Sequence, residues 1–129
     1  MQTELEVSLP AAPVSVREAR ETIAEIAGRA GASARKIEDI RLCVSEAVAN
    51  VVRHAYVRTE GDLTITVERT GPELTVIVRD DGVGLGAFRQ DGDLGYGLRI
   101  IDELTTRCSI TSAPNVGTEI RMVFALEAR

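Results

Sequence analysis

One stretch, residues 38–56, constrains the fold more than any other part of the sequence. Its apolar residues recur at steps of three and four, as in a helix with one face packed on a core. They are Ile40, Val44, Ala47, Val48 and Val51. Polar residues recur at similar steps on a second face, namely Glu46, Asn50, Arg53 and His54. The stretch therefore predicts a long helix that is packed on one side and carries functional groups on another.

Glu46 and Asn50 stand one helical turn apart in this stretch, so their side chains project side by side. A carboxylate and a carboxamide so placed can hold a hydrated metal ion and a reacting hydroxyl group. They can equally form part of a solvated face, and the helix alone leaves both interpretations open. His54 is interpreted as structural, because a lone histidine near a helix end is more often hydrogen-bonded packing than chemistry.

A strand and a helix are expected before this stretch. Residues 4–9 alternate between apolar and polar side chains, as in a half-buried strand that Pro10 and Pro13 then stop. Ser15, with a glutamate three residues later, fits a capping box and predicts a helix that runs to about Arg29. Its expected buried positions are Val16, Ala19, Ile23, Ile26 and Ala30. Ser33 is predicted to cap the long helix that follows.

The outer face of this first helix is charged. Its charged residues are Arg17, Arg20, Glu21 and Glu25. A solvated face with local ion pairs explains such a pattern. A more specific interpretation is a partner-binding face formed by Arg17, Arg20 and Glu21. The sequence leaves open whether this face is solvated or binds a partner.

Strands dominate the second half of the chain. Residues 63–69 and 74–79 alternate in polarity around a Thr-Gly-Pro turn, which predicts an antiparallel hairpin with one covered face. A short helix is expected over residues 98–104, and further strands around 108–110 and 120–126. Segregated helices and strands predict an α+β fold, a two-layer α/β sandwich with a mostly antiparallel, mixed sheet covered on one face by three helices.

Composition fits a single globular domain over residues 1–129, with 44% hydrophobic but only 3% aromatic residues, so aliphatic side chains must fill the core. A net charge of −5 argues against direct binding to nucleic acid and permits a basic protein partner. No stretch is long and apolar enough for a membrane span, and the start lacks a secretory pattern. We expect a cytoplasmic protein without membrane contact, with Cys43 and Cys108 as reduced thiols.

Two glycine-rich turns flank a polar stretch, residues 85–94, that we expect to be a mobile loop. They are Asp80-Asp81-Gly82-Val83-Gly84 and Gly95-Tyr96-Gly97-Leu98. Each alone is explained as a tight turn or a helix entry. Together they offer free backbone amides and a positive helix end to an anion. Neither fits the dinucleotide fingerprint or the lysine-containing phosphate loop, so a phosphate-bearing ligand is predicted in a different architecture.

Four motifs resemble the ATP-binding domain shared by DNA gyrase, the large heat-shock chaperone, sensor histidine kinases and the mismatch-repair protein MutL, known as the Bergerat or GHKL fold. In order they are Glu46 to Asn50 with His54 and Tyr56, the two glycine-rich turns, and Gly117-Thr118. Within this group, the chain is most similar to the bacterial anti-sigma factors that are also serine kinases. The similarity lies in the sequence SEAVANVVRHAY, the small size, and a strand followed by a helix at the start.

This resemblance implies an ATP- and Mg²⁺-dependent protein-serine kinase that sequesters a sigma factor and phosphorylates a serine of an anti-sigma-factor antagonist. It implies that Glu46 is the general base and that Asn50 coordinates Mg²⁺. The implied nucleotide-binding residues are Asn50, Asp80, Gly82, Gly84, Gly95, Gly97, Leu98 and Thr118. Asp80 would accept a hydrogen bond from the adenine amino group, with Thr118 supporting it. The family often pairs through its sheet edge, so a homodimer through the N-terminal strand is expected.

The chain departs from the family pattern before Gly95. Asp93 and Leu94 stand where some members carry an arginine that reaches the terminal phosphate, and Arg89 is the only cation of that loop. The alternative function is therefore a nucleotide-gated protein-binding regulator with little or no kinase activity. A free-standing sensor histidine kinase domain and a conformational ATPase of the gyrase or MutL type are not expected, because neither a phospho-accepting histidine module nor a transducer domain is seen.

Overall fold

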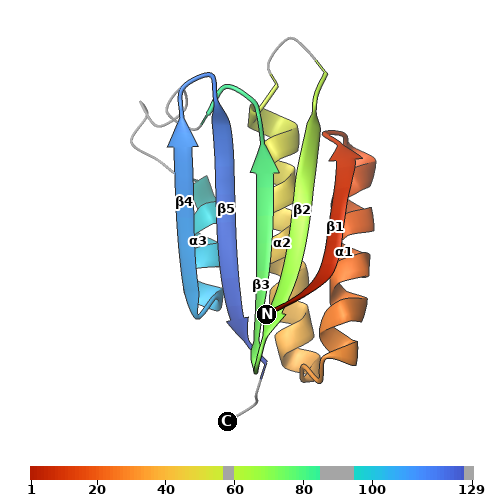
Figure 1. The fold of residues 1–129 in the computed structure, drawn as a ribbon. Coiled ribbons are helices and arrows are strands. Elements are labelled where there is room, and N and C mark those ends of the chain that lie inside the picture. The colour runs from red at the N-terminus through yellow and green to blue at the C-terminus, as the bar shows by residue number, and fades with distance from the viewer. Residues whose placement is uncertain (57–59, 85–94, 127–129) are drawn as a thin grey trace.

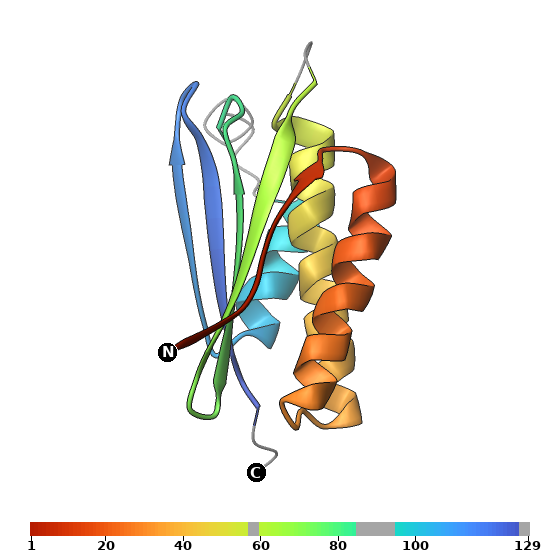
Figure 2. The same ribbon diagram turned by 45° about the vertical axis from the view of Figure 1, so that its right-hand side comes forward.

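The computed structural model describes residues 1–56, 60–84 and 95–126. Its elements, in chain order, are β1 (Gln2–Pro10), α1 (Pro13–Arg29), α2 (Ala34–His54), β2 (Asp62–Thr70), β3 (Glu73–Asp80), α3 (Gly95–Leu104), β4 (Arg107–Ala113) and β5 (Gly117–Ala125). The five strands form one sheet in the order β1-β2-β3-β5-β4. The helices lie side by side behind this sheet (Figure 1), and the turned view separates the two layers (Figure 2).

This arrangement confirms the α+β fold and the two-layer sandwich. All three described helices cover one face of the sheet, as expected. The strand pairs β1–β2, β2–β3, β3–β5 and β4–β5 are all antiparallel, so the sheet of the described strands is antiparallel throughout rather than mixed.

The β2–β3 hairpin forms the middle of the sheet. The side chains of β2 that face the helices are buried: Leu63, Ile65 and Val67. Thr64 and Thr66 between them are half-buried on the opposite face, because successive side chains of a strand point to opposite sides. Gly71 makes the turn with a φ of 58°, a conformation that costs glycine little.

The long helix α2 supplies one side of the core. Its predicted buried positions are all buried: Ile40, Val44, Ala47, Val48 and Val51. Each valine or isoleucine side chain so buried contributes about 1.5–3 kcal/mol relative to exposure. Facing strands add further aliphatic side chains together with Phe124, which is fully buried. On α1 the predicted Ala19 and Ile23 are buried, whereas Val16, Ile26 and Ala30 are half-buried at the margin of the core.

The two predicted helix caps have different outcomes. Ser33 caps α2 as expected, since its side chain accepts a hydrogen bond from the backbone N–H of Lys36 at 3.1 Å. The prediction for Ser15 is wrong, because α1 begins at Pro13 and its N-cap is Ala12, which has no capping side chain. Proline suits the first helical position. Ser15 lies inside the first turn, where its buried hydroxyl donates a hydrogen bond to the Pro10 carbonyl at 2.6 Å.

Other expectations hold with small changes. The helix α3 begins at Gly95, before the expected start at Leu98. Cys43 and Cys108 are free thiols; the first is buried and the second half-buried. Within the described parts of the chain, we find no helix whose length and apolar content would let it cross a membrane.

Candidate functional site

The predicted motifs meet at one end of the sheet. There β3 ends at Asp80, β5 begins at Gly117, α2 ends at His54 and α3 begins at Gly95 (Figure 1). Asp80 and Thr118 are direct partners in the β3–β5 pairing. Segments that are far apart in the sequence therefore come together at one site.

Asp80 is held at the floor of this site by backbone groups. Its side chain is buried, at 5% exposure, and its Oδ1 accepts a hydrogen bond from the Gly82 N–H at 2.8 Å. The backbone N–H of Thr118 is a second donor. Burial raises the pKa of the Asp80 carboxyl, and the two backbone donors oppose that rise. The result is a carboxyl group with a fixed direction and little access to bulk water.

Thr118 and Gly117 support Asp80 from β5. Gly117 has a φ of 133°, and a β-carbon there would overlap the Asp80 carbonyl oxygen, so only glycine fits this close approach. The Thr118 hydroxyl lies 3.2 Å from the Ser112 hydroxyl, and the two are hydrogen-bonded. Ser112 was not among the predicted site residues. The register of the β4–β5 hairpin pairs it with Thr118, and aligning these two strands in the sequence would have found it.

The first glycine-rich turn is packed between α2 and the β4–β5 turn. Gly82 lies against the Ala55 carbonyl oxygen, which a β-carbon would overlap. Val83 between the glycines donates to the Ala55 carbonyl at 2.9 Å and accepts from the Asn115 N–H at 3.0 Å. Gly84 has a φ of 84°, and a β-carbon there would lie 2.6 Å from the Ala113 carbonyl oxygen. The glycines are therefore required by close backbone contacts within the fold.

Glu46 and Asn50 lie on consecutive turns of α2, and Glu46 faces α3. Glu46 is half-buried and Asn50 is buried, at 9% exposure. The Glu46 side chain lies directly against Gly97, where a β-carbon would overlap the carboxylate oxygen Oε1. The second glycine-rich turn therefore meets the helical motif. The first-turn N–H groups of a helix lack intrahelical partners, so the carboxylate lies near groups that attract anions.

The other predicted residues take varied positions. Leu98 is buried in the core, so its side chain anchors α3 rather than lining an opening. Gly95 opens α3. Arg89 and the expected mobile loop, residues 85–94, lie outside the described residues. His54 is half-buried, and burial together with Arg53 lowers its pKa, which leaves the ring neutral near pH 7.

A magnesium ion held mainly by phosphates would need only one or two oxygen atoms from this site. Among the described residues, no group of three or more His, Cys, Asp or Glu side chains gathers as a metal site. Mg²⁺ usually keeps several waters and takes one or two protein oxygens plus the oxygens of a bound phosphate. Asn50, buried one helical turn beyond Glu46, could supply one such oxygen atom, which leaves the Glu46 carboxylate free to act on a substrate proton.

The predicted partner-binding residues lie elsewhere, on α1. Arg17 is exposed, and Arg20 pairs with Glu21 at 3.0 Å. Glu21 also pairs with Arg41 of α2 at 3.2 Å. These ion pairs line a groove of about 660 Å³ between α1 and α2, in which the exposed Leu42 also lies. The ion pairs agree with a solvated face and leave its use as a docking surface open.

Comparison with known proteins decides the family. Residues 9–124 match the histidine kinase-like ATPase domain. The chain belongs to this family. As a histidine kinase-like ATPase domain, it carries an ATP-binding site.

The chain also resembles individual members of the family. It is 34% identical over 96 residues to the serine-protein kinase RsbW of Listeria innocua, covering 74% of this chain and 61% of that protein. It is 27% identical over 133 residues to the anti-sigma F factor of Clostridium acetobutylicum, covering 95% and 93%. The chain thus spans about three-fifths of the RsbW protein that it matches.

A solved structure supports the fold of the histidine kinase-like ATPase domain. The crystal structure of the RsbU and RsbW domains of Rv1364c from Mycobacterium tuberculosis matches with a TM-score of 0.75 at 24% sequence identity. The match covers 95% of this chain and 31% of that chain. At this identity the likeness concerns the fold alone.

Proposed function

We propose that this protein is an ATP- and Mg²⁺-dependent protein-serine kinase that sequesters a sigma factor and phosphorylates a serine of an anti-sigma-factor antagonist. The contact between Glu46 and Gly97 carries the proposal, because it brings a carboxylate of α2 against the first turn of α3. Asn50 lies one turn further along α2. The names of similar proteins, a serine-protein kinase and an anti-sigma F factor, support the same activity.

Asp80 is the proposed adenine-binding residue. Its buried carboxyl accepts hydrogen bonds from Gly82 and Thr118 and is therefore fixed before any ligand arrives. In this role it accepts a further hydrogen bond from the adenine amino group. Gly82 and Gly84 present backbone without side chains, so a flat base can approach closely. Thr118 supports the aspartate from the neighbouring strand.

The phosphates are proposed to lie at the start of α3. Gly95 and Gly97 offer backbone N–H groups there, and the helix dipole favours negative charge. Asn50 would hold Mg²⁺, which neutralises charge on the phosphates. Glu46 accepts the proton of the incoming serine hydroxyl while the serine oxygen bonds to the terminal phosphorus, and ADP leaves with the electrons of the broken bond.

The face of α1 that carries Arg17, Arg20 and Glu21 is the proposed docking surface for protein partners. Arg20 and Glu21 line the groove between α1 and α2, together with the exposed Leu42. Leu42 precedes Glu46 by one helical turn of α2, so the groove next to α1 and the proposed base next to α3 are one turn apart on this helix. This proximity supports docking of the antagonist here, with its serine directed toward Glu46.

Assembly and location are part of the proposal. β1 forms one edge of the sheet, so its outer backbone groups are available to pair with a second copy. We place the homodimer contact at this edge and the protein in the cytoplasm, without direct binding to nucleic acid or membrane. Light scattering of the purified protein tests the dimer, and a monomer mass at micromolar concentration would remove it from the proposal.

A kinase assay tests the central activity. Labelled ATP, Mg²⁺ and the cognate antagonist should yield phosphoserine, and Glu46→Gln should abolish the product while ATP still binds. Glu25→Gln is the matched control, because Glu25 is an exposed carboxylate of α1 that pairs only locally with Arg29. Nucleotide binding that tightens a sigma-factor complex without any phosphoserine would instead establish the nucleotide-gated regulator.

Charge reversal tests the docking surface. Arg20→Glu and Glu21→Arg should each weaken the complex with the antagonist or the sigma factor in a pull-down titration. Arg29→Glu, at the far end of the same helix, is the control and should leave both complexes unchanged. Equal affinities in all three variants would exclude this face of α1.

A further inference from the structure

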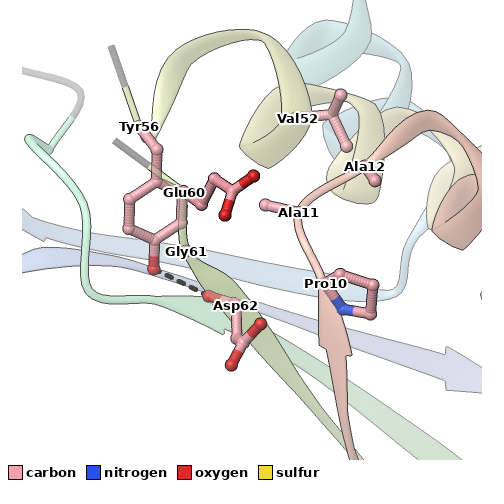
Figure 3. Close-up of a pocket in the computed structure, with 8 residues that line it drawn as sticks. All are labelled: Pro10, Ala11, Ala12, Val52, Tyr56, Glu60, Gly61 and Asp62. Carbon is pink, nitrogen blue, oxygen red and sulfur yellow. Dashed lines mark hydrogen bonds between the residues drawn. The ribbon is translucent and has the colours of Figure 1, made fainter. Parts of the chain in front are cut away.

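Tyr56 lies just beyond the end of α2 and joins separate segments of the chain. Its hydroxyl donates a hydrogen bond to the Asp62 carbonyl oxygen at 2.7 Å (Figure 3) and accepts one from the Asp81 N–H at 3.0 Å. Asp62 begins β2, and Asp81 directly follows the aspartate that ends β3. One phenol hydroxyl thus ties the end of the long helix to the turn that carries Asp80.

The same turn is held a second time by Ala55, the neighbour of Tyr56. The Ala55 carbonyl accepts from the Val83 N–H at 2.9 Å. Acceptors on two consecutive residues therefore bind the N–H groups on either side of Gly82. Because Gly82 itself donates to Asp80 Oδ1 at 2.8 Å, the backbone held by these acceptors is the one that orients the carboxylate.

We propose that Tyr56 is a positioning residue for the recognition of adenine by Asp80. This inference rests on the proposed function, since it takes Asp80 as the residue that binds the adenine amino group. Tyr56 acts through the Asp81 N–H and not by touching the nucleotide. Its hydroxyl fixes the turn, and the turn sets the direction in which the Asp80 carboxylate faces the base.

The ring of Tyr56 packs against the margin of the core and is open on one side. It lies against Gly61, where a β-carbon would overlap the ring. Another side of the ring lines an open cavity of about 480 Å³, together with Pro10, Ala11 and Val52 among others (Figure 3). Packing does not enclose the ring on that side, so the two hydrogen bonds of the hydroxyl add to the packing in fixing where the ring lies.

Nucleotide titrations of Tyr56→Phe test the proposal. ITP is the matched ligand for ATP, because its base carries an oxygen where adenine carries the amino group. We expect Tyr56→Phe to bind ATP about three- to tenfold more weakly, the effect of one lost hydrogen bond. Its affinity for ITP should stay at the wild-type value. An unchanged ATP affinity, or an equal loss for both nucleotides, would overturn the inference.

Thr106→Val is the matched control variant. The Thr106 hydroxyl also accepts one backbone N–H, from Ala125 at 3.1 Å, but it lies at the opposite end of the sheet, where β4 begins and β5 ends. Both nucleotide affinities should stay unchanged in this variant. Amide hydrogen exchange of Tyr56→Phe without nucleotide gives a second measurement. The Asp81 N–H should exchange faster, while the Val83 N–H stays protected; equal acceleration of both would indicate a general loss of structure and contradict the proposal.

Gly61→Ala tests the same role while keeping the tyrosine. The added β-carbon must push the ring aside, and the end of a side chain can move, so we expect the fold to persist and the ratio of ATP to ITP affinity to fall as in Tyr56→Phe. Wild-type protein that fails to bind ATP would refute the proposed function, and this inference with it. If the wild-type protein binds ATP, and Tyr56→Phe and Gly61→Ala keep the wild-type ratio of ATP to ITP affinity, only the role of Tyr56 is refuted.

Discussion

Gly97 in α3 lies directly against Glu46 in α2, with no space for a side chain between them. A β-carbon on Gly97 would stand 3.3 Å from the Glu46 β-carbon and would overlap its carboxylate. The first turn of α3 and the middle of α2 therefore define together where this carboxylate can lie. The fold thereby imposes a fixed position on the proposed base.

Gly97→Ala should separate nucleotide binding from phosphoryl transfer. The methyl group must displace the Glu46 carboxylate, and loss of a correctly placed general base lowers a rate by about a hundredfold or more. The backbone N–H of residue 97 remains, so we expect ATP affinity to change far less than the rate. A radiolabel transfer assay with parallel ATP titrations measures both, and a wild-type transfer rate would contradict the role of this contact.

Asp80→Asn should weaken ATP selectively. The Asp80 carboxyl accepts hydrogen bonds from the Gly82 and Thr118 N–H groups. An asparagine has one acceptor oxygen for these donors, so its NH₂ group turns toward the adenine amino group, and two donors then face each other. We expect about tenfold or greater loss of ATP affinity, in the range for an unsatisfied buried polar group. ITP is the control ligand; equal affinity for ATP in the variant would remove Asp80 from adenine recognition.

Asp80 should also couple stability to pH. Burial raises the pKa of its carboxyl above the usual value of 3.8. The folded state then binds this proton more tightly than the unfolded state, so stability is greatest below the unfolded pKa and falls as pH rises through the folded pKa. The asparagine side chain of Asp80→Asn does not titrate, so the variant does not share this loss of stability. The stability of the variant relative to the wild type should therefore rise as pH increases from about 4 to 7. Urea unfolding at several pH values measures the difference, and a difference that is constant with pH would contradict the effect of burial.

The sequence predicts the fold well where burial is periodic. The apolar residues of α2 and the alternating residues of β2 are buried as expected, because a helix and a strand each place their buried side chains at a fixed period. The serine pattern at Ser15 fails because Ser-x-x-Glu also fits the interior of a helix. Pro13, with its preset φ, moves the start of α1 to an earlier residue.

The candidate site was only partly predictable, for a physical reason. Motif order identifies the segments with Glu46, Asp80 and Gly97. The acceptors that hold these segments together include the Ala55 carbonyl and the Tyr56 hydroxyl. Every residue has a backbone carbonyl, so the sequence does not show which of them accepts a hydrogen bond from a distant segment. These hydrogen bonds follow only from tertiary packing.

Cys43 should resist alkylation in the folded protein. Burial raises the pKa of its thiol to about 12, and the nearby Asp39 adds to the rise. The reactive thiolate is then scarce near pH 7. Cys108 is half-buried, with a pKa also raised by burial and by Asp102, so we expect iodoacetamide to modify Cys108 first. Peptide mass spectrometry of a labelling time course measures the order. Rapid labelling of Cys43 without denaturant would show that the core opens readily around α2.

Helix capping provides a paired test of stability. Ser33→Ala removes the hydrogen bond to the Lys36 N–H and should lower the free energy of unfolding by about 1 kcal/mol. Ala12 has the extended backbone of an N-cap, with φ −135° and ψ 155°, but no side chain that can accept. Ala12→Asp adds an acceptor and a negative charge at the start of α1, and should raise the free energy of unfolding by about 0.5–1 kcal/mol. Urea denaturation of both variants measures the opposite shifts. If Ala12→Asp is no more stable than the wild type, the N–H groups of the first turn of α1 already have other partners. That result would contradict the interpretation of Ala12 as an N-cap that lacks an acceptor.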